Sequence, residues 1–168
     1  MKARAILAQV ACWASFAALV GWLSQAPAYT PLKPGHALVK LSLSHAGERE
    51  SACRARSAEE LAKLAPNMRA PLDCPRARVP LRVVLEMDGE PLFEAVAPPT
   101  GINRDLPSAV YRRIEVPAGP HAFRARLADA PGGAFRHEAR EQRALAAGDV
   151  LVIDFAAAAG GFRFHPER

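Results

Sequence analysis

The feature of this chain that most constrains its fold is an apolar run close to the N-terminus. Residues 6–23 contain no charged side chain, and they follow a short basic start, Met1-Lys2-Ala3-Arg4. At about 1.5 Å per helical residue, such a run nearly crosses a hydrocarbon core of about 30 Å. Trp22 lies at its outer end, where an indole favours the lipid–water boundary. The sequence therefore predicts a membrane-spanning helix within an N-terminal anchor, residues 1–28.

A cleaved signal peptide is the alternative interpretation of the same segment. Ala26-Pro27-Ala28 fits the rule of small residues on either side of a cleavage site. The uncharged run is longer than the usual signal core of about 7–15 residues, which favours an anchor that is kept. Under both interpretations residues 29–168 are exported, because Lys2 and Arg4 hold the N-terminus in the cytoplasm.

The composition of the remaining residues indicates one small exported domain. Removing residues 1–28 from a chain of 168 leaves enough length for one hydrophobic core, which disfavours a multidomain enzyme or a polytopic transporter. Richness in Arg, Ala and Pro suggests a bacterium of high GC content. We therefore expect a single-pass protein of the bacterial inner membrane whose C-terminal domain, residues 29–168, lies in the periplasm.

Short segments of alternating apolar and polar residues recur through the exported part. They are residues 38–44, 81–87, 91–96, 110–116, 123–127, 138–145, 150–155 and 162–164. Gly- and Pro-containing turns separate them, and Asp88-Gly89 is a strong hairpin signal. No helical pattern of 10–15 residues lies between the strands, which disfavours a parallel α/β fold. We expect a mainly β protein, an antiparallel β-sandwich of seven or eight strands.

A long connection, residues 45–80, interrupts this strand pattern and carries Cys53 and Cys74. A loop of this length inside a small domain usually has a function or is stabilised by bonds of its own. In an oxidising compartment the simplest expectation is a Cys53–Cys74 disulfide, worth about 3 kcal/mol in the loop-closure model. Ser57 and Glu60 match a helix capping box, so we expect one short helix over 58–64, ended by Pro66.

Metal binding is an alternative use of the same loop. His45, Cys53, Met68 and Cys74 together offer soft ligands that suit Cu(I). No pair among them has the close spacing that arranges ligands in advance, so we expect no resident metal or cofactor. Free or redox-exchanging thiols are the third possibility for the two cysteines.

Positive charge is concentrated in this region. Residues 49–82 contain eight cations and four acids, whereas cations and acids nearly balance in the rest of the exported part. Such a loop can attract anionic headgroups or an acidic protein surface, or it can simply be solvated. Export and the lack of interleaved aromatic residues disfavour nucleic acid. The candidate interaction surface consists of Arg49, Arg54, Arg56, Arg69, Arg76 and Arg78.

Motifs of catalysis are missing from the sequence. It contains no nucleophile elbow, no zinc-protease helix, no dinucleotide fingerprint and no P-loop. His137 adjoins Glu138, but neighbours on a strand point to opposite faces and make a poor catalytic pair. His121 follows a turn, where a capping or surface role is expected. The 97–108 loop suits a recognition site or a rigid connection. We expect a protein that is not an enzyme.

The stretch Val116-Pro117-Ala118-Gly119-Pro120-His121, followed by an alternating strand, resembles PEGA-like and transthyretin-like sandwich modules. The layout of one span, a Cys-bearing loop and a sandwich is similar to that of short proteobacterial envelope proteins. The resemblance implies a small extracytoplasmic domain for binding or structural support, and such envelope proteins are associated with respiratory oxidases. The single anchor, the missing catalytic motifs and the localised arginines beside two cysteines lead us to expect a non-catalytic accessory protein that contacts another membrane complex. The alternative is a copper- or thiol-handling assembly factor for an envelope enzyme. No small-molecule ligand is indicated.

Overall fold

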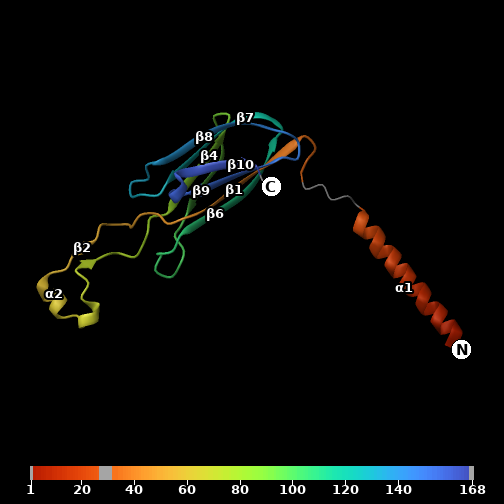
Figure 1. Cartoon of the computed structure of the whole chain (residues 1–168), viewed down its shortest axis with the longest axis horizontal. Helices are drawn as coiled ribbons and strands as arrows, with labels where there is room; N and C mark the ends of the chain where they lie inside the picture. Colours follow the sequence, from red (N-terminus) through yellow and green to blue (C-terminus); the bar gives the residue numbers. More distant parts are fainter. Residues whose placement is uncertain (1, 27–31, 167–168) are drawn as a thin grey trace. The chain divides into compact units, whose positions relative to one another are not determined.

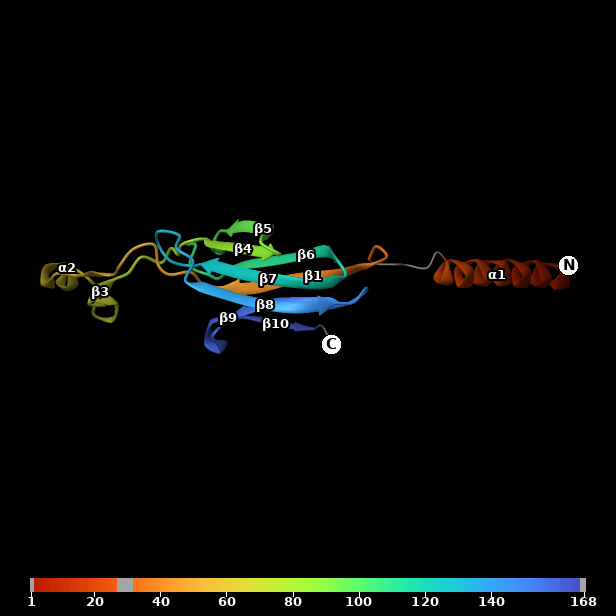
Figure 2. The same ribbon diagram turned by 90° about the horizontal axis from the view of Figure 1, so that it is seen from above.

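The computed structural model describes residues 2–26 and 32–166, which belong to two separate compact units, Met1–Lys33 and Pro34–Arg168. The first unit is one helix, α1 (Lys2–Gln25), drawn in Figures 1 and 2. Its residues 3–25 are long and apolar enough to cross a membrane, and an N-terminal signal sequence would pass the same test. The expected cleavage motif extends to Pro27 and Ala28, which lie outside the described residues.

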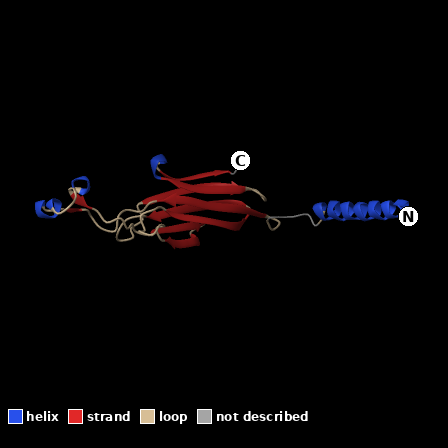
Figure 3. Ribbon diagram, turned by 90° about the horizontal axis from the view of Figure 1, so that it is seen from below, coloured by secondary structure: helices blue, strands red, loops and turns tan. Residues whose placement is uncertain are grey.

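The second unit is built on two four-stranded sheets, in the orders β10-β9-β1-β6 and β5-β4-β7-β8. Figure 3 shows these strands in red, running lengthwise through the domain. The strands are β1 (His36–His45), β4 (Leu81–Met87), β5 (Glu90–Ala97), β6 (Ser108–Pro117), β7 (Gly119–Ala128), β8 (His137–Leu145), β9 (Val150–Ala156) and β10 (Gly161–Pro166). A 3-10 turn, η2 (Ala157–Ala159), joins β9 to β10. The expected mainly β architecture is confirmed.

The core lies between the two sheets and is formed by every second residue of the strands. Leu41 and Ile153 from the first sheet and Leu85, Phe123 and Leu127 from the second are all at most 1% exposed. This burial follows the period of two along a strand, which sends alternate side chains to one face. Each large buried side chain contributes about 1.5–3 kcal/mol relative to exposure.

One strand pair differs from the expected antiparallel pattern. β1 and β9 run parallel, in register from Leu38 opposite Val150 to Leu43 opposite Phe155. Parallel neighbours need a long crossover connection. Here the chain between β1 and β9 supplies it, since that stretch forms β4, β5, β7 and β8 of the other sheet. The alternation of apolar residues is the same in either direction, so it could not reveal this pairing.

The hairpin predicted at Asp88-Gly89 is confirmed, with φ of 55° and 89° at the two residues. The carboxylate of Asp88 accepts a 2.8 Å hydrogen bond from the Ala122 amide and lies 2.7 Å from His121 Nδ1. Through this contact His121 ties β7 to the β4–β5 turn. The capping role expected for His121 therefore agrees with its position.

Between β1 and β4 the chain leaves the sandwich, and we call residues 46–80 the arm. It contains β2 (Arg54–Ala55), α2 (Ala58–Ala62), η1 (Pro66–Met68) and β3 (Leu72–Asp73). Figures 1 and 2 show it extending beyond the ends of the strands. The helix is shorter than expected, and Pro66 begins the 3-10 turn instead of ending α2. A proline is well accommodated at a first helical position, where its missing N–H would have no partner.

Candidate functional site

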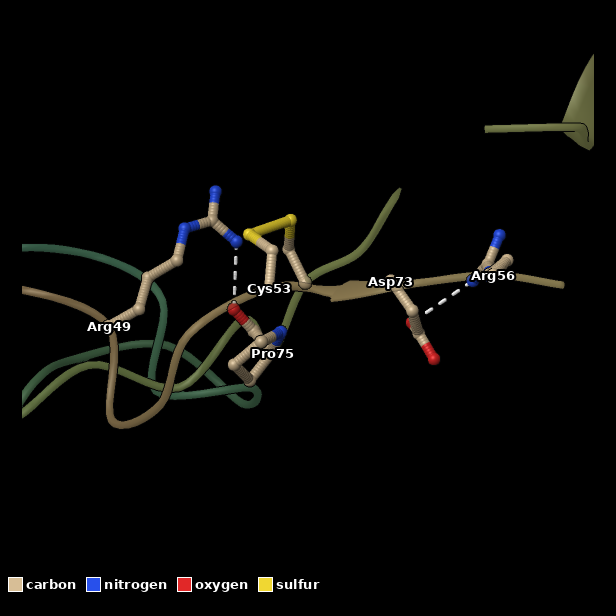
Figure 4. Close-up of a disulfide and its surroundings, with 6 residues drawn as sticks. Arg49, Cys53, Arg56, Asp73 and Pro75 are labelled. Carbon is tan, nitrogen blue, oxygen red and sulfur yellow. Dashed lines mark hydrogen bonds and ion pairs between the residues drawn. A yellow bond between two sulfur atoms is a disulfide. The ribbon is translucent and has the colours of Figure 1, made fainter. Parts of the chain in front are cut away.

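The arm is closed by a disulfide between Cys53 and Cys74, whose Cα atoms are 4.2 Å apart. Figure 4 shows this bond. It lies beside one end of the short ladder in which Arg54 faces Asp73 and Ala55 faces Leu72. The disulfide predicted from Cys53 and Cys74 is confirmed. It encloses the whole tip of the arm, so this segment has a covalent boundary of its own.

Ion pairs hold α2 against that ladder. Arg54 donates to Glu60 at 3.0 Å and to Asp73 at 3.4 Å. Arg56 donates to Asp73 at 3.0 Å, the pair that Figure 4 shows. The predicted capping box is present, because the Ser57 amide donates to the Glu60 carboxylate and Ser57 Oγ accepts from the Glu60 amide. The hydrogen bond from the Ser57 amide, reinforced by Arg54, lowers the pKa of Glu60.

Other arginines of the candidate surface donate to backbone carbonyls. Arg49 reaches Pro75 O at 2.8 Å, as Figure 4 shows, and Arg69 reaches Leu64 O at 3.0 Å. Arg78 donates to Gly47 O and Asp105 O, at 2.8 and 3.0 Å.

Within the described part of the chain, Arg76 is exposed and makes no hydrogen bond or ion pair. The other five arginines of the set hold the protein's own loops in place. Arg54 nevertheless keeps 60% of its side chain exposed. An interaction role for the set stays a prediction, and its positive charge is partly neutralised by Glu60 and Asp73.

The base of the arm is joined to two further loops at the same end of the sandwich. The Glu48 amide donates to Asp129 O at 2.7 Å, and the Arg78 amide donates to Arg104 O at 3.0 Å. The two arm segments approach so closely at Gly47 that an added Cβ would lie 2.5 Å from Val79 O. We call the arm, the 98–107 loop and the 129–136 loop together the loop end.

Exposed apolar side chains lie on two parts of the loop end, the arm and the 98–107 loop. Met68 and Leu72 are 62% and 52% exposed, and Leu106 is 54% exposed. Ile102, at the tip of the 98–107 loop, is fully exposed. That loop is nevertheless fixed, because Thr100 pairs with Leu106 and Thr100 Oγ1 donates to Pro107 O at 2.8 Å. Rigid loops that present apolar side chains are typical of recognition surfaces.

A concave surface of about 390 Å³ lies at the base of the arm. Its lining residues are Glu48, Arg49, Ser51, Ala52, Cys53 and Pro131. A hollow of about 720 Å³ lies elsewhere, over β8, β9 and β10, where its lining includes Arg140, Asp154 and Phe162. Only the first combines the disulfide-closed arm with a second loop, so it is the one that belongs to the loop end.

A cluster that the sequence did not reveal lies beside the arm. Asp129, directly after β7, is buried, and its Oδ2 lies 2.9 Å from His45 Nε2 and 3.2 Å from His137 Nε2. Its Oδ1 accepts a hydrogen bond from Arg136 at 3.0 Å, and Arg136 also contacts Glu48 at 2.7 Å. Burial raises the pKa of Asp129, but the hydrogen bonds from His45, Arg136 and His137 outweigh it and lower that pKa overall. The carboxylate is therefore charged at neutral pH.

The set of His45, Cys53, Met68 and Cys74 is not assembled as a copper site. The two sulfurs are bonded to each other, so they do not supply two thiolates. His45 faces Asp129 instead, and Met68 is exposed to solvent. A thiol-handling role for the cysteine pair stays a prediction.

The expectation that His137 and Glu138 diverge agrees with their contacts. Glu138 pairs with Arg124 at 2.7 Å and with Arg140 at 2.9 Å, and these bonds lower its pKa to about 2. His137 turns to Asp129 on the other face of β8. His45 and Asp129 are 84 residues apart, so no local motif could have joined them.

Comparison with protein-family models and with curated proteins finds no match for this chain. The resemblance to PEGA-like and transthyretin-like modules therefore stays a prediction.

Proposed function

We propose that this protein is a non-catalytic interaction module, tethered to the bacterial inner membrane, whose loop end binds the periplasmic surface of a membrane-protein complex. The observation that carries the proposal is the pairing of rigidity and exposure at the loop end. Hydrogen bonds and a disulfide fix its loops, while Met68, Leu72, Ile102 and Leu106 remain open to solvent.

The tether and the compartment rest on two features of the chain. Helix α1 is long and apolar enough to serve as a membrane anchor, and Lys2 and Arg4 favour a cytoplasmic N-terminus. The Cys53–Cys74 disulfide is typical of an oxidising compartment such as the periplasm. Intact mass spectrometry of protein isolated from membranes tests the tether: retention of residues 1–28 supports it, and their loss would show a cleaved signal peptide.

The chemistry of the loop end suits a partner with an apolar patch and an acidic rim. Met68 on the arm and Ile102 on the 98–107 loop offer apolar side chains, and the exposed Arg69 and Arg76 lie on the arm. Apolar anchors ringed by polar residues are the usual composition of a specific interface. Among membrane complexes, a respiratory one is the candidate suggested by the resemblance to proteobacterial envelope proteins.

Site-specific photo-crosslinking in native membranes tests this proposal. A photo-reactive phenylalanine analogue is placed at Met68 or at Ile102 in the full chain, and the crosslinked protein is identified by mass spectrometry. Matched controls carry the analogue at Val96 or Tyr111, which are 61% and 63% exposed but lie on β5 and β6. We expect one membrane-complex subunit to be captured from Met68 and Ile102 and not from the controls.

A second variant distinguishes contact from proximity. Met68→Glu with Ile102→Glu places charge in the proposed apolar contact and should abolish copurification of the captured subunit. Both side chains are exposed, so the thermal unfolding of the sandwich should not change. Equal crosslinking from Tyr111, or unchanged copurification with the double variant, would overturn the proposal.

A further inference from the structure

The cluster of His45, Asp129 and His137 has the dimensions of a metal site. The three ligand atoms, two Nε2 and one Oδ2, all lie within 4.8 Å of one another. The two nitrogen–oxygen separations are 2.9 and 3.2 Å. Tetrahedral zinc, with bonds of about 2.0–2.1 Å to nitrogen and oxygen, separates its ligand atoms by about 3.3 Å. Small side-chain movements therefore suffice to admit an ion.

The two imidazole rings are held in place by the fold. His45 is the last residue of β1 and His137 the first of β8, so each ring is carried by a strand end. The buried ring of Phe155 packs edge-on against both, with centroid distances of 4.9 and 5.0 Å. Ligands that are oriented before binding lose less freedom when the ion arrives.

A second layer of residues orients the carboxylate. Asp129 Oδ1 accepts from Arg136, which leaves Oδ2 directed at the two histidines. Glu48, 2.7 Å from Arg136, offsets the positive charge that this guanidinium brings near the cluster. Ligating carboxylates in metal sites are commonly hydrogen-bonded in this way. Asp129 is 8% exposed and His137 31%, so the cluster is enclosed but open on the His137 side.

We infer that His45, Asp129 and His137 bind a divalent transition-metal ion, with zinc the best match, at the base of the arm. Two imidazole nitrogens and one carboxylate oxygen suit Zn²⁺, and no sulfur is present to favour Cu(I). The metal takes an unprotonated Nε2 from each ring, so each neutral histidine then carries its proton on Nδ1. Water entering beside His137 completes four-coordination.

The bound ion would join the two sheets at the loop end. His45 belongs to the first sheet. Asp129 directly follows β7 of the second sheet, and His137 is the first residue of β8 in that sheet. Glu48, next to the cluster, is part of the arm and donates its amide to Asp129 O. The metal site goes beyond the proposed partner binding and does not depend on it.

Zinc titration of the full chain in detergent micelles tests this inference. The protein is prepared without a histidine tag and carries Cys12→Ser, because the exposed thiol in α1 could bind zinc on its own. We expect one Zn²⁺ per chain and a higher melting temperature with Zn²⁺ than with Mg²⁺ or a chelator. His137→Gln removes a direct ligand and should lower the zinc affinity at least about tenfold. Changes to residues that only support a ligand already cost about that much.

The control variant is His165→Gln. His165 contacts Asp154 at 3.3 Å beside Arg163, an exposed arrangement with the same residue types but a single histidine. This variant should bind zinc like the parent protein. Equal zinc uptake by the parent and His137→Gln, or less than one zinc per chain in the parent, would overturn the inference.

A spectroscopic measurement on the same Cys12→Ser protein needs no further variant. Co²⁺ bound in the same place should show the intense visible absorption of tetrahedral coordination and should be displaced by one equivalent of Zn²⁺. The weak absorption of hexahydrated Co²⁺, unchanged by the protein, would contradict a site of two histidines and one carboxylate. The outcome is independent of whether any partner binds at the loop end.

Discussion

The arm and the sandwich belong to one domain but are stabilised by different means. The sandwich buries a continuous apolar cluster contributed by both sheets, in which Phe123 is 1% exposed. None of residues 48–80, all of which the structure describes, is buried. The arm relies on the Cys53–Cys74 bond, the capping box of α2 and hydrogen bonds from arginines.

This difference shows how a small domain keeps a rigid segment at its surface. Folding has to offset the conformational entropy of every ordered residue, and the sandwich does so by burying apolar area. A segment of this size cannot enclose a hydrophobic core, so a disulfide and polar hydrogen bonds stabilise it instead. As a result, Met68 and Leu72 stay exposed on an ordered backbone. The following predictions test the separation between the two regions.

The largest effect is expected in the sandwich core. Phe123→Ala leaves a cavity among fully buried side chains and should lower the free energy of unfolding by about 3–5 kcal/mol. Urea denaturation of the full chain in micelles measures it. The control Val96→Ala, at a 61% exposed position on β5, should change stability by less than about 0.5 kcal/mol. Similar losses in both variants would contradict the position of the core.

The second effect concerns the arm. Cys53→Ser with Cys74→Ser removes a constraint of about 3 kcal/mol on the unfolded loop and should loosen the arm far more than the sandwich. Trypsin should then cleave at arginines between the two positions much faster than in the parent protein, while the sandwich remains a protected fragment. Cys12→Ser is the matched control. Cooperative loss of the whole domain would show that the arm and the sandwich are not separable.

The third effect lies at the junction of the two regions. Arg78→Gln loses the charged hydrogen bonds to Gly47 O and Asp105 O, which should destabilise the loop end by about 1–3 kcal/mol. Hydrogen exchange at residues 46–49 and 98–107 should rise. Arg76→Gln, an exposed neighbour without such bonds, should leave exchange unchanged. Equal protection in both variants would contradict the role of Arg78 in joining the loops.

The smallest effect is a pH dependence of the His121–Asp88 contact, which lies near the start of β7. The hydrogen bond to Asp88 raises the pKa of His121 above its ordinary value. This contact therefore stabilises the fold fully below the unfolded-state pKa of histidine, about 6.5, and less as the pH rises through the folded-state value. The melting-temperature difference between the parent and His121→Gln should shrink across that range. A difference that grew with pH would have the wrong sign.

The strands, the Asp88-Gly89 hairpin and the capping box could be predicted because each depends on residues close in sequence. The disulfide could be predicted from the two cysteines of one loop together with the oxidising compartment expected for it. Alternating residues determine which side chains face a core, and Ser57 with Glu60 determines where α2 begins. The roles of the arginines could not be predicted in the same way. Net charge shows that a loop is basic, but it does not show which acceptors the folded loop presents.

The sequence by itself determined an apolar N-terminal helix, a mainly β domain and a disulfide-closed loop, because these follow from local periodicity and residue chemistry. Only the tertiary structure decided that β9 runs parallel to β1 and that His45, Asp129 and His137 meet. The first depends on how strands far apart in the sequence pair within one sheet, and the second on how the two sheets pack. The physical reason is that a period of two specifies a face of a strand but neither its direction nor its neighbours.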